Sequence, residues 1–276
     1  MSFWILFLVA VAAGLVGSMT GMGGGVVLVP ALTLLGVDIK HAIATSMIAV
    51  IATSSGSAAA YVRDRITNLK VGMFLEMFTI LGAWVGASIT LAAGRRWLFI
   101  LFGAILLASA VSMLAERRKD RRAVPEQDKF THWLEMEGSY YDSAEQQRID
   151  YTPRRAYLGG PSMFGAGLIA GLLGIGAGAL KVLIFDVVMG MPSKVSTTTS
   201  DLIIGVTALA GTSVYLAAGL IDPRYAAPVI LGVLAGAYAG TRVLVRLTNR
   251  VVQMLFVVVL LGLGGQMVWR GIQGGL

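Results

Sequence analysis

Two glycine-rich stretches decide how this chain folds: TGMGGGVVLVP at Thr20–Pro30 and LGIGAGALKVL at Leu173–Leu183. Each places several glycines inside an apolar segment, although glycine costs a helix interior about 1 kcal/mol relative to alanine. Each stretch therefore predicts a helix that is interrupted at its glycines. Because the two stretches lie about half the chain apart, they also suggest that one interrupted unit occurs twice.

The composition predicts a membrane protein. Hydrophobic residues make up 56% of the chain and charged residues 13%, with a mean hydropathy of +0.77, whereas soluble domains hold roughly 25% charged residues. Apolar runs of about 18 residues or more recur, as spans require. They are Ala42–Val62, Leu69–Ala93, Trp97–Ala115, Val195–Leu220, Tyr225–Leu247 and Val251–Val268. Since these runs do not alternate with polar residues, the prediction is an all-α polytopic membrane protein rather than a β-barrel.

The charges point to the bilayer and not to nucleic acid. The net charge is +7, but the basic residues cluster between apolar runs, where they set membrane topology. The absence of cysteine excludes disulfides, cysteine-ligated zinc and thiol catalysis. Because residues 1–21 have no basic region ahead of the apolar run, we interpret them as structural and not as a cleaved signal peptide.

A repeat becomes visible when the second half is shifted against the first. A shift of 153 aligns Gly14 with Gly167 and the glycines of the two breaks. After one inserted residue, GAWVGA at Gly82–Ala87 aligns with GAYAGT at Gly236–Thr241. We predict two repeated units of four apolar segments, at 1–115 and 158–276. A cytoplasmic linker at 116–157 joins them, with a small β-hairpin expected within Glu137–Arg155.

The segments around the glycines are predicted to be short arms. They are Phe3–Val16 and Val26–Val37 in the first unit, and Met163–Leu173 and Ala179–Met191 in the second. Arms of this length reach at most ~21 Å, less than the ~30 Å hydrocarbon core. Each pair therefore suits a re-entrant hairpin or a broken helix, followed by three full spans.

An odd number of crossings in each unit makes the two units inverted repeats. With the linker in the cytoplasm, this arrangement distributes the second half's basic residues as the positive-inside rule prefers. Those inside are Lys194, Arg242, Arg246 and Arg250, and those outside are Arg224 and Arg270. The alternative is eight full crossings with parallel units.

A bound anion would explain why glycines interrupt the two helices. A helix that starts inside the membrane leaves its first N–H groups unpaired and carries about half a positive charge there. Glycines let the backbone approach an anion that satisfies these groups. The expected substrate-binding residues in the breaks are Thr20, Gly21, Met22, Gly23, Gly24, Gly25, Gly174, Gly176 and Gly178. Close packing of helices through small residues is the alternative.

Polar side chains near the breaks extend this candidate site. Lys181 adds positive charge, unless it reaches toward the membrane surface. Hydroxyl groups open the following spans and could donate to an oxyanion, or only bond within their helix; they belong to Thr45, Ser46, Thr198, Thr199 and Ser200. Asp201 is a candidate coupling residue or partner of Lys181, or simply an acid at a helix start. Glu76 is expected to pair with Arg63, Arg65 or Lys70.

The motifs resemble those of the TauE/SafE family of sulfite exporters. The likeness rests on GSMTGMGGGVVLVPAL, GLLGIGAGALKVL and the ATS and TTTS motifs that follow them, and it extends over nearly the whole chain. It implies transport of small sulfur oxyanions or organosulfonates, usually as export. Leu173 and Ala177 stand where the first motif has Thr20 and Gly24, so the two breaks do not offer identical contacts.

The sequence thus predicts a secondary transporter of sulfite, thiosulfate or organosulfonates in the cell inner membrane, working by alternating access. No Walker A motif is present, so this chain does not itself use ATP. An anion channel of the same architecture is the alternative. No metal, cofactor or enzymatic activity is expected, because HExxH, paired intramembrane acids and a βαβ context for the glycines are lacking. The expected partners are a small anion and lipid, and a homo-oligomer stays open.

Overall fold

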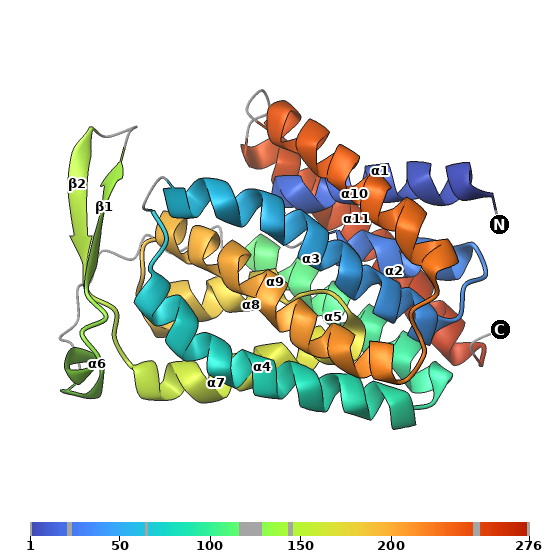
Figure 1. Ribbon diagram of the computed structural model, residues 1–276, viewed down its shortest axis with the longest axis horizontal. Coiled ribbons are helices and arrows are strands. Elements are labelled where there is room, and N and C mark those ends of the chain that lie inside the picture. Colours follow the sequence, from blue (N-terminus) through green and yellow to red (C-terminus); the bar gives the residue numbers. More distant parts are fainter. Residues whose placement is uncertain are drawn as a thin grey trace.

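The computed structural model describes residues 2–20, 24–63, 66–115, 129–142, 146–244 and 249–274. These residues are mostly helical, which confirms the helical part of the predicted fold class (Figure 1). The first half forms α1 (Phe3–Thr20), α2 (Gly25–Leu34), α3 (Ile39–Arg63), α4 (Leu69–Ala92) and α5 (Arg95–Ala115). The middle forms α6 (Lys129–Trp133), β1 (Gly138–Asp142) and β2 (Gln147–Tyr151). The second half forms α7 (Ala156–Leu173), α8 (Gly178–Leu183), the π-helical segment η2 (Ile184–Val188), α9 (Ser193–Ala217), α10 (Pro223–Leu244) and α11 (Asn249–Ile272).

Several helices have the length and apolarity of membrane spans. Among the described residues, α4, α7 and α9 satisfy both criteria over a full 18-residue window. The apolar parts of α1, α2, α3 and α11 are shorter. The described part of the chain therefore supports a multi-pass membrane protein.

The arm that precedes each glycine break is longer than the sequence predicted. Both α1 and α7 have 18 residues, which extend about 27 Å. The predicted start of the second arm at Met163 was wrong, because α7 begins at Ala156 and contains Pro161. Proline removes one backbone N–H, yet membrane helices tolerate it where neighbouring groups satisfy the freed carbonyl. Only the arms that follow the breaks, α2 and α8 with η2, are short.

Each pair of arms forms a hairpin that opens at one end of the bundle. The Arg154 N–H, just before α7, donates to the Met189 carbonyl, just after η2, at 3.0 Å. The second hairpin therefore begins and ends beside the linker. At the opposite end Arg270 donates to the Thr33 carbonyl of α2 at 2.7 Å. The N-terminus lies at that same end, so the first hairpin opens there (Figure 1).

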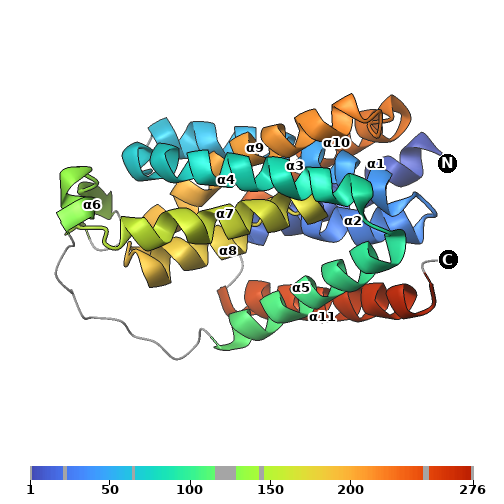
Figure 2. The ribbon, with the colours of Figure 1, turned by 90° about the horizontal axis from the view of Figure 1, so that it is seen from below.

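The helices pack in pairs that follow the sequence repeat. α1 packs along α10, and α4 packs along α7. The repeat relates α1 to α7 and α4 to α10, so these two pairs are equivalent. α3 packs on α9, and α5 packs on α11 along one side of the bundle (Figure 2); each of these pairs joins equivalent helices.

Glycines set the closest of these contacts, and they do so in the same way in both halves. A methyl group on Gly82 would overlap the carbonyl of Phe164, and one on Gly236 would overlap the carbonyl of Val11. Gly82 and Gly236 are matched positions of the repeat, and so are Val11 and Phe164. Only glycine lets two helix backbones approach this closely.

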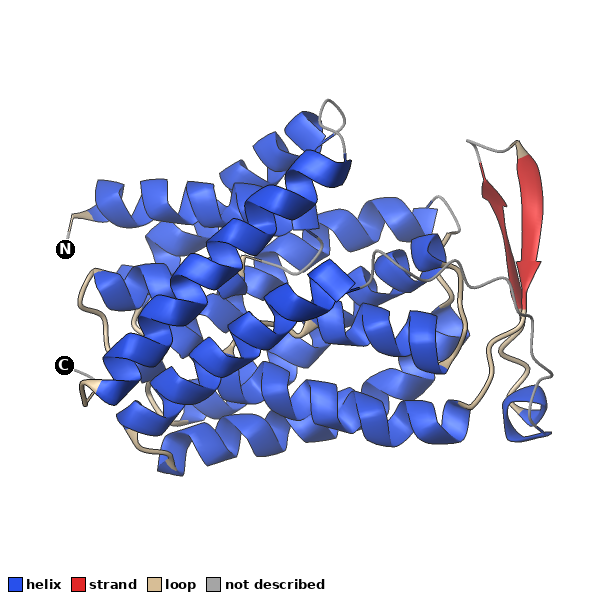
Figure 3. Cartoon of the chain, turned by 180° about the vertical axis from the view of Figure 1, so that it is seen from behind, coloured by secondary structure: helices blue, strands red, loops and turns tan. Residues whose placement is uncertain are grey.

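The linker contains the expected strand pair, outside the helical bundle (Figure 3). β1 and β2 are antiparallel, with Tyr140 opposite Ile149. The Asn68 side chain, which caps α4, donates to the Met136 carbonyl at 3.1 Å and to the Tyr151 hydroxyl at 3.0 Å. The hairpin is thereby attached to the start of α4.

Gly167→Ala should destabilise the protein, whereas Gly165→Ala on the same helix should not. A methyl group on Gly167 would overlap the backbone of Thr79, and one on Gly165 would meet nothing within 4 Å. Overpacking of this kind costs about 1–3 kcal/mol, while alanine improves helix propensity by up to about 1 kcal/mol. Thermal unfolding of both variants in detergent tests this. Equal melting temperatures would contradict the close approach of α4 and α7.

Candidate functional site

The two glycine breaks touch each other inside the bundle. A methyl group on Gly25, the first residue of α2, would overlap the carbonyl of Gly174 in the α7–α8 break. The same methyl group would lie against Ile175 and Val50. The sequence therefore needs glycine at position 25 so that the start of α2 can lie directly against the second break.

The α7–α8 break is a tight left-handed turn. Gly174 and Gly176 have φ of 71° and 67°, and Ala177 has φ of 51°. Glycine adopts this region freely, but a residue with a Cβ rarely does. Ala177 caps the start of α8, so the break keeps its shape at this position despite an unfavourable side chain. The matched residue of the first break, Gly24, has an ordinary φ of −66°.

A small cavity lies where both short helices begin. Val26 of α2 and Gly178 of α8 line it together, with Leu106 and Ser109 of α5 and Leu260 of α11. Its volume is about 20 Å³, which holds about one water molecule. The start of each short helix thus borders a shared space, but this conformation leaves no room there for a sulfur oxyanion.

Two of the predicted hydroxyl groups bond the backbone of the breaks. The Ser46 hydroxyl on α3 lies 2.8 Å from the Gly174 carbonyl and 2.8 Å from its own helix's Ile43 carbonyl. The Ser200 hydroxyl on α9 donates to the Gly178 carbonyl at 3.2 Å. Ser46 thus bonds a carbonyl at the C-terminal end of α7, where helix carbonyls lack a partner within the helix, and Ser200 bonds the first residue of α8.

The three predicted threonines have different environments. Thr198 bonds carbonyls of its own helix, and Thr199 accepts the N–H of Asn68 at 3.1 Å. Thr45 is fully buried, and its hydroxyl has no hydrogen-bond partner among the described residues. Thr45 therefore has unused hydrogen-bonding capacity on the helix that bonds the second break.

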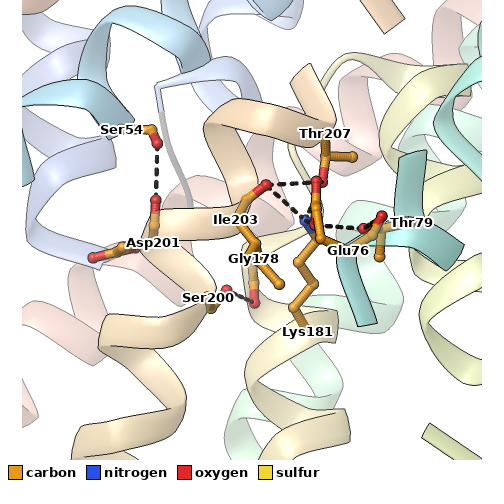
Figure 4. A network of polar contacts seen from close by, with 9 residues as sticks. All are labelled: Ser54, Glu76, Thr79, Gly178, Lys181, Ser200, Asp201, Ile203 and Thr207. Atoms are coloured by element: carbon orange, nitrogen blue, oxygen red, sulfur yellow. Dashed lines mark hydrogen bonds and ion pairs between the residues drawn. The ribbon is translucent and has the colours of Figure 1, made fainter. Parts of the chain in front are cut away.

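Lys181 lies in a buried polar network of three helices (Figure 4). Its ammonium nitrogen is 3.6 Å from the Glu76 carboxylate of α4 and 3.4 Å from the Ile203 carbonyl of α9, and it also donates to the Thr207 hydroxyl. The Lys181 and Glu76 side chains are 0% and 3% exposed. The expected pairing of Glu76 with Lys70 was wrong, because Lys70 lies against Glu135.

Asp201 does not join this network. Its side chain points away from Lys181 (Figure 4), although it is only 8% exposed. Its backbone carbonyl accepts a hydrogen bond from Ser54 of α3 at 2.8 Å. The predicted alternative that Asp201 partners Lys181 was therefore wrong.

The remaining predicted residues lie at or beyond the edge of the described structure. Gly21, Met22 and Gly23 lie outside the described residues. Thr20 is the last residue of α1, and Gly24 directly precedes α2. Of the predicted glycines, Gly25 and Gly174 are brought together, whereas Gly24 lies against Ala13 and Gly176 against Ile204.

Comparison with known proteins identifies the family. The model of the family described as "Sulfite exporter TauE/SafE" matches residues 6–267. The chain belongs to this family. The names of the family and of the curated relatives describe transporters and not enzymes.

Three curated relatives resemble this TauE/SafE protein over most of their length. The "Probable membrane transporter protein YunE" of Bacillus subtilis (strain 168) is 27% identical, with 99% of both chains covered. YdhB of the same strain, also named a probable membrane transporter protein, is 25% identical over 86% of this chain and 87% of its own. A probable membrane transporter protein of Xylella fastidiosa (strain 9a5c) is 26% identical over 94% and 93%. No solved structure matches the chain.

Sequence reasoning missed Glu76 as the partner of Lys181 in this TauE/SafE protein. A signal was present, because charged residues within spans usually face the bundle interior and pair with one another. The described spans hold few charged residues. Pairing the acid Glu76 of the first half with the base Lys181 of the second half was therefore the simplest expectation. Position along the chain misled the prediction, since Glu76 lies only one or two turns from the basic linker end.

Lys181→Met should destabilise this TauE/SafE protein by about 3–5 kcal/mol, because it leaves a buried carboxylate without its cation. Replacing both partners, with Glu76→Gln and Lys181→Met together, should recover most of that loss. The control is Lys70→Met, whose exposed ion pair with Glu135 contributes at most about 1 kcal/mol. Thermal unfolding in detergent measures all three. A double variant as unstable as Lys181→Met would contradict the pairing.

Proposed function

We propose that this chain is a secondary transporter that moves small sulfur-containing anions, such as sulfite, thiosulfate or organosulfonates, out of the cell. The observation that carries this proposal is the meeting of two interrupted helices at one cavity, bordered by Val26 and Gly178, in a chain of the sulfite exporter family. Matched interrupted segments in the two halves of a membrane protein mark the binding site of many transporters.

The chemistry of the breaks suits an anion. The first N–H groups of α2 and of the α8–η2 segment have no partner within their own helix, and each helix start carries a partial positive charge. Hydrocarbon has no hydrogen-bond acceptor for these N–H groups, so a bound solute or a buried water must satisfy them. A sulfonate or sulfite group presents three oxygens that accept such hydrogen bonds. The Thr45 hydroxyl, next in sequence to Ser46 and without a partner among the described residues, is a further uncharged donor.

We further propose that the two units are inverted repeats. The glycine contacts support this, because α1 and α10 run in the same direction: Gly232 meets Phe7 and Gly240 meets Leu15. α4 and α7 also run in the same direction, whereas α3 and α9 run in opposite directions, with Met47 at Gly211 and Ser54 at Gly205. Matched helices of the two units therefore run oppositely. The two hairpins open at opposite ends of the bundle, as inversion requires.

Alternating access fits this arrangement. Each hairpin connects the shared cavity to one end of the bundle, and the present cavity of about 20 Å³ is too small for a sulfonate. Movement of one unit against the other would open the cavity toward one side at a time. The alternative is an anion channel of the same architecture, which would need a continuous pore when open.

We place the linker, residues 116–157, in the cytoplasm and the protein in the inner membrane. The linker carries five basic residues between positions 117 and 122. Lys194, at the start of α9, lies at the same end of the bundle, while Arg224 and Arg270 lie at the other end. The excess of basic residues at the linker end is what the positive-inside rule assigns to the cytoplasm.

Purified protein in proteoliposomes should exchange a labelled sulfur anion by counterflow. Sulfite, thiosulfate, sulfate, taurine, isethionate and sulfoacetate are the compounds to screen, first by thermal shift, because ligand at 100 times its Kd stabilises the folded state by about 2.7 kcal/mol. Exchange should saturate with concentration. The absence of both a shift and exchange with every compound would contradict the proposal, and single-channel currents would favour the channel.

Gly25→Ala should weaken anion binding and exchange at least tenfold, because its methyl group would separate the two breaks. The control is Gly94→Ala, at a position where a methyl group meets nothing within 4 Å. Gel filtration verifies that both variants fold. Unchanged affinity in a folded Gly25→Ala protein would remove the contact between the breaks from the binding site.

A further inference from the structure

Lys181 has no donor left for a substrate in this conformation. An ammonium group has three N–H donors, and here they face the Glu76 carboxylate, the Ile203 carbonyl and the Thr207 hydroxyl. All of these groups are buried. If Lys181 is to bind an anion at the start of α8, it must first leave Glu76.

Separation of this pair creates a problem of charge. With the pair intact, the site is neutral. A monovalent anion that binds Lys181 while Glu76 stays ionised leaves one net negative charge buried in the membrane, which is costly. Uptake of one proton by Glu76 restores neutrality, and the protonated carboxyl no longer needs the ammonium group.

The surroundings of Glu76 can accommodate that proton. In the present state one carboxylate oxygen accepts the Thr207 hydroxyl at 2.6 Å and the other accepts the Thr79 hydroxyl at 2.5 Å. Each hydroxyl also has a backbone carbonyl within reach, Ile203 at 3.0 Å for Thr207 and Glu76 itself at 2.9 Å for Thr79. A hydroxyl that turns its hydrogen to the carbonyl can accept the O–H of a protonated Glu76. Both protonation states of Glu76 are therefore hydrogen-bonded.

On the described helices that pack around Glu76, no titratable group besides Glu76 and Lys181 lies in the network. α7, which packs against α4, carries only Tyr157, half-exposed near its start. α9 carries Lys194, Asp201 and Tyr215, and of these Asp201 points away from Lys181 (Figure 4). The hydroxyl of Tyr215 donates to Gly171 at 2.5 Å. Asp186 of η2 accepts the Ser193 hydroxyl at 2.9 Å.

We propose that Glu76 is a proton-binding residue that couples one proton to each transported anion. The anion displaces Glu76 from Lys181, Glu76 takes a proton from the aqueous side that the anion came from, and release of both on the other side restores the pair. Lys181 keeps its own proton throughout. This inference rests on the proposed transport function and adds its coupling ion. Because the proton moves in the same direction as the anion, net export is driven by the outward gradient of the anion itself.

The site is present once in the duplicated fold. The residue of the first unit that matches Lys181 is Leu28, and the residue of the second unit that matches Glu76 is Ile230. The first hairpin therefore has no equivalent acid–base pair. One proton is expected for each monovalent anion, and the combined step moves no net charge.

Isethionate uptake into proteoliposomes tests the coupling, because a sulfonate keeps one negative charge at all relevant pH values. With a gradient of one pH unit, acid outside, the wild-type protein should accumulate isethionate about tenfold. With one proton coupled to each anion, the inside-to-outside ratio of isethionate at equilibrium equals the outside-to-inside ratio of protons. Glu76→Gln should exchange isethionate yet accumulate none. The matched controls are Asp201→Asn and Glu135→Gln, which should accumulate it as the wild type does.

The possible failures are distinguishable. Absence of isethionate exchange in the wild type would contradict the proposed function, and this inference with it. Exchange that ignores the pH gradient would contradict the coupling alone, and loss of accumulation in Asp201→Asn would assign the proton to Asp201. Should Glu76→Gln fail to fold, proton uptake on isethionate binding to the wild type in weakly buffered detergent decides. Uptake of about one proton for each anion bound supports the proposal, and the absence of proton uptake overturns it.

Discussion

The bundle depends on one contact, the meeting of two interrupted helices at Gly25 and the Gly174 carbonyl. A helix that ends inside a membrane exposes backbone groups that lipid cannot satisfy. Here the two interruptions lie against each other, and Ser46 bonds the Gly174 carbonyl at the end of α7. What is left over is a set of N–H groups at two helix starts, beside a cavity. This leftover polarity is what the proposed anion would satisfy.

The packing of the bundle follows from the same small residues. Gly82 and Gly167 let α4 and α7 approach closely, and Gly236 and Gly14 do the same for α10 and α1. Apolar side chains give little net attraction between helices in lipid, so close backbone contact must hold such pairs together. Each of these two pairs joins one helix from each half. The halves are therefore intertwined, and neither hairpin packs mainly on its own unit.

Much of this could be predicted from the sequence. The helices from α3 to α5 and from α9 to α11 coincide with long apolar runs, and the glycine repeat located both breaks. The start of α7 could not be predicted, because a Gly-Gly-Pro sequence at 159–161 normally ends a helix, and only neighbours in the bundle make it tolerable. The partner of Lys181 depends on which helices touch. No local pattern reveals that α4 of one half lies against α8 and α9 of the other.

The duplication is also unequal, and the differences concentrate at the site. Lys181 has Leu28 as its counterpart, and Ala177, held at positive φ, has Gly24. The fold preserves the glycines that both halves need for packing, while Glu76 of the first half and Lys181 of the second each have an apolar counterpart in the other half. Structural constraint and chemical function are thus carried by different residues of the repeat.

Asn68 connects the β1–β2 hairpin to the helical bundle. Its side chain holds Tyr151 and the Met136 carbonyl, and its backbone N–H is bound by Thr199 of α9. One residue thus joins the start of α4, the strand pair and the helix that carries Thr207. An antibody fragment or a fluorescent label on the hairpin would accordingly sense any sliding of α4 past α9, which makes this surface a reporter of conformational state that is accessible from water.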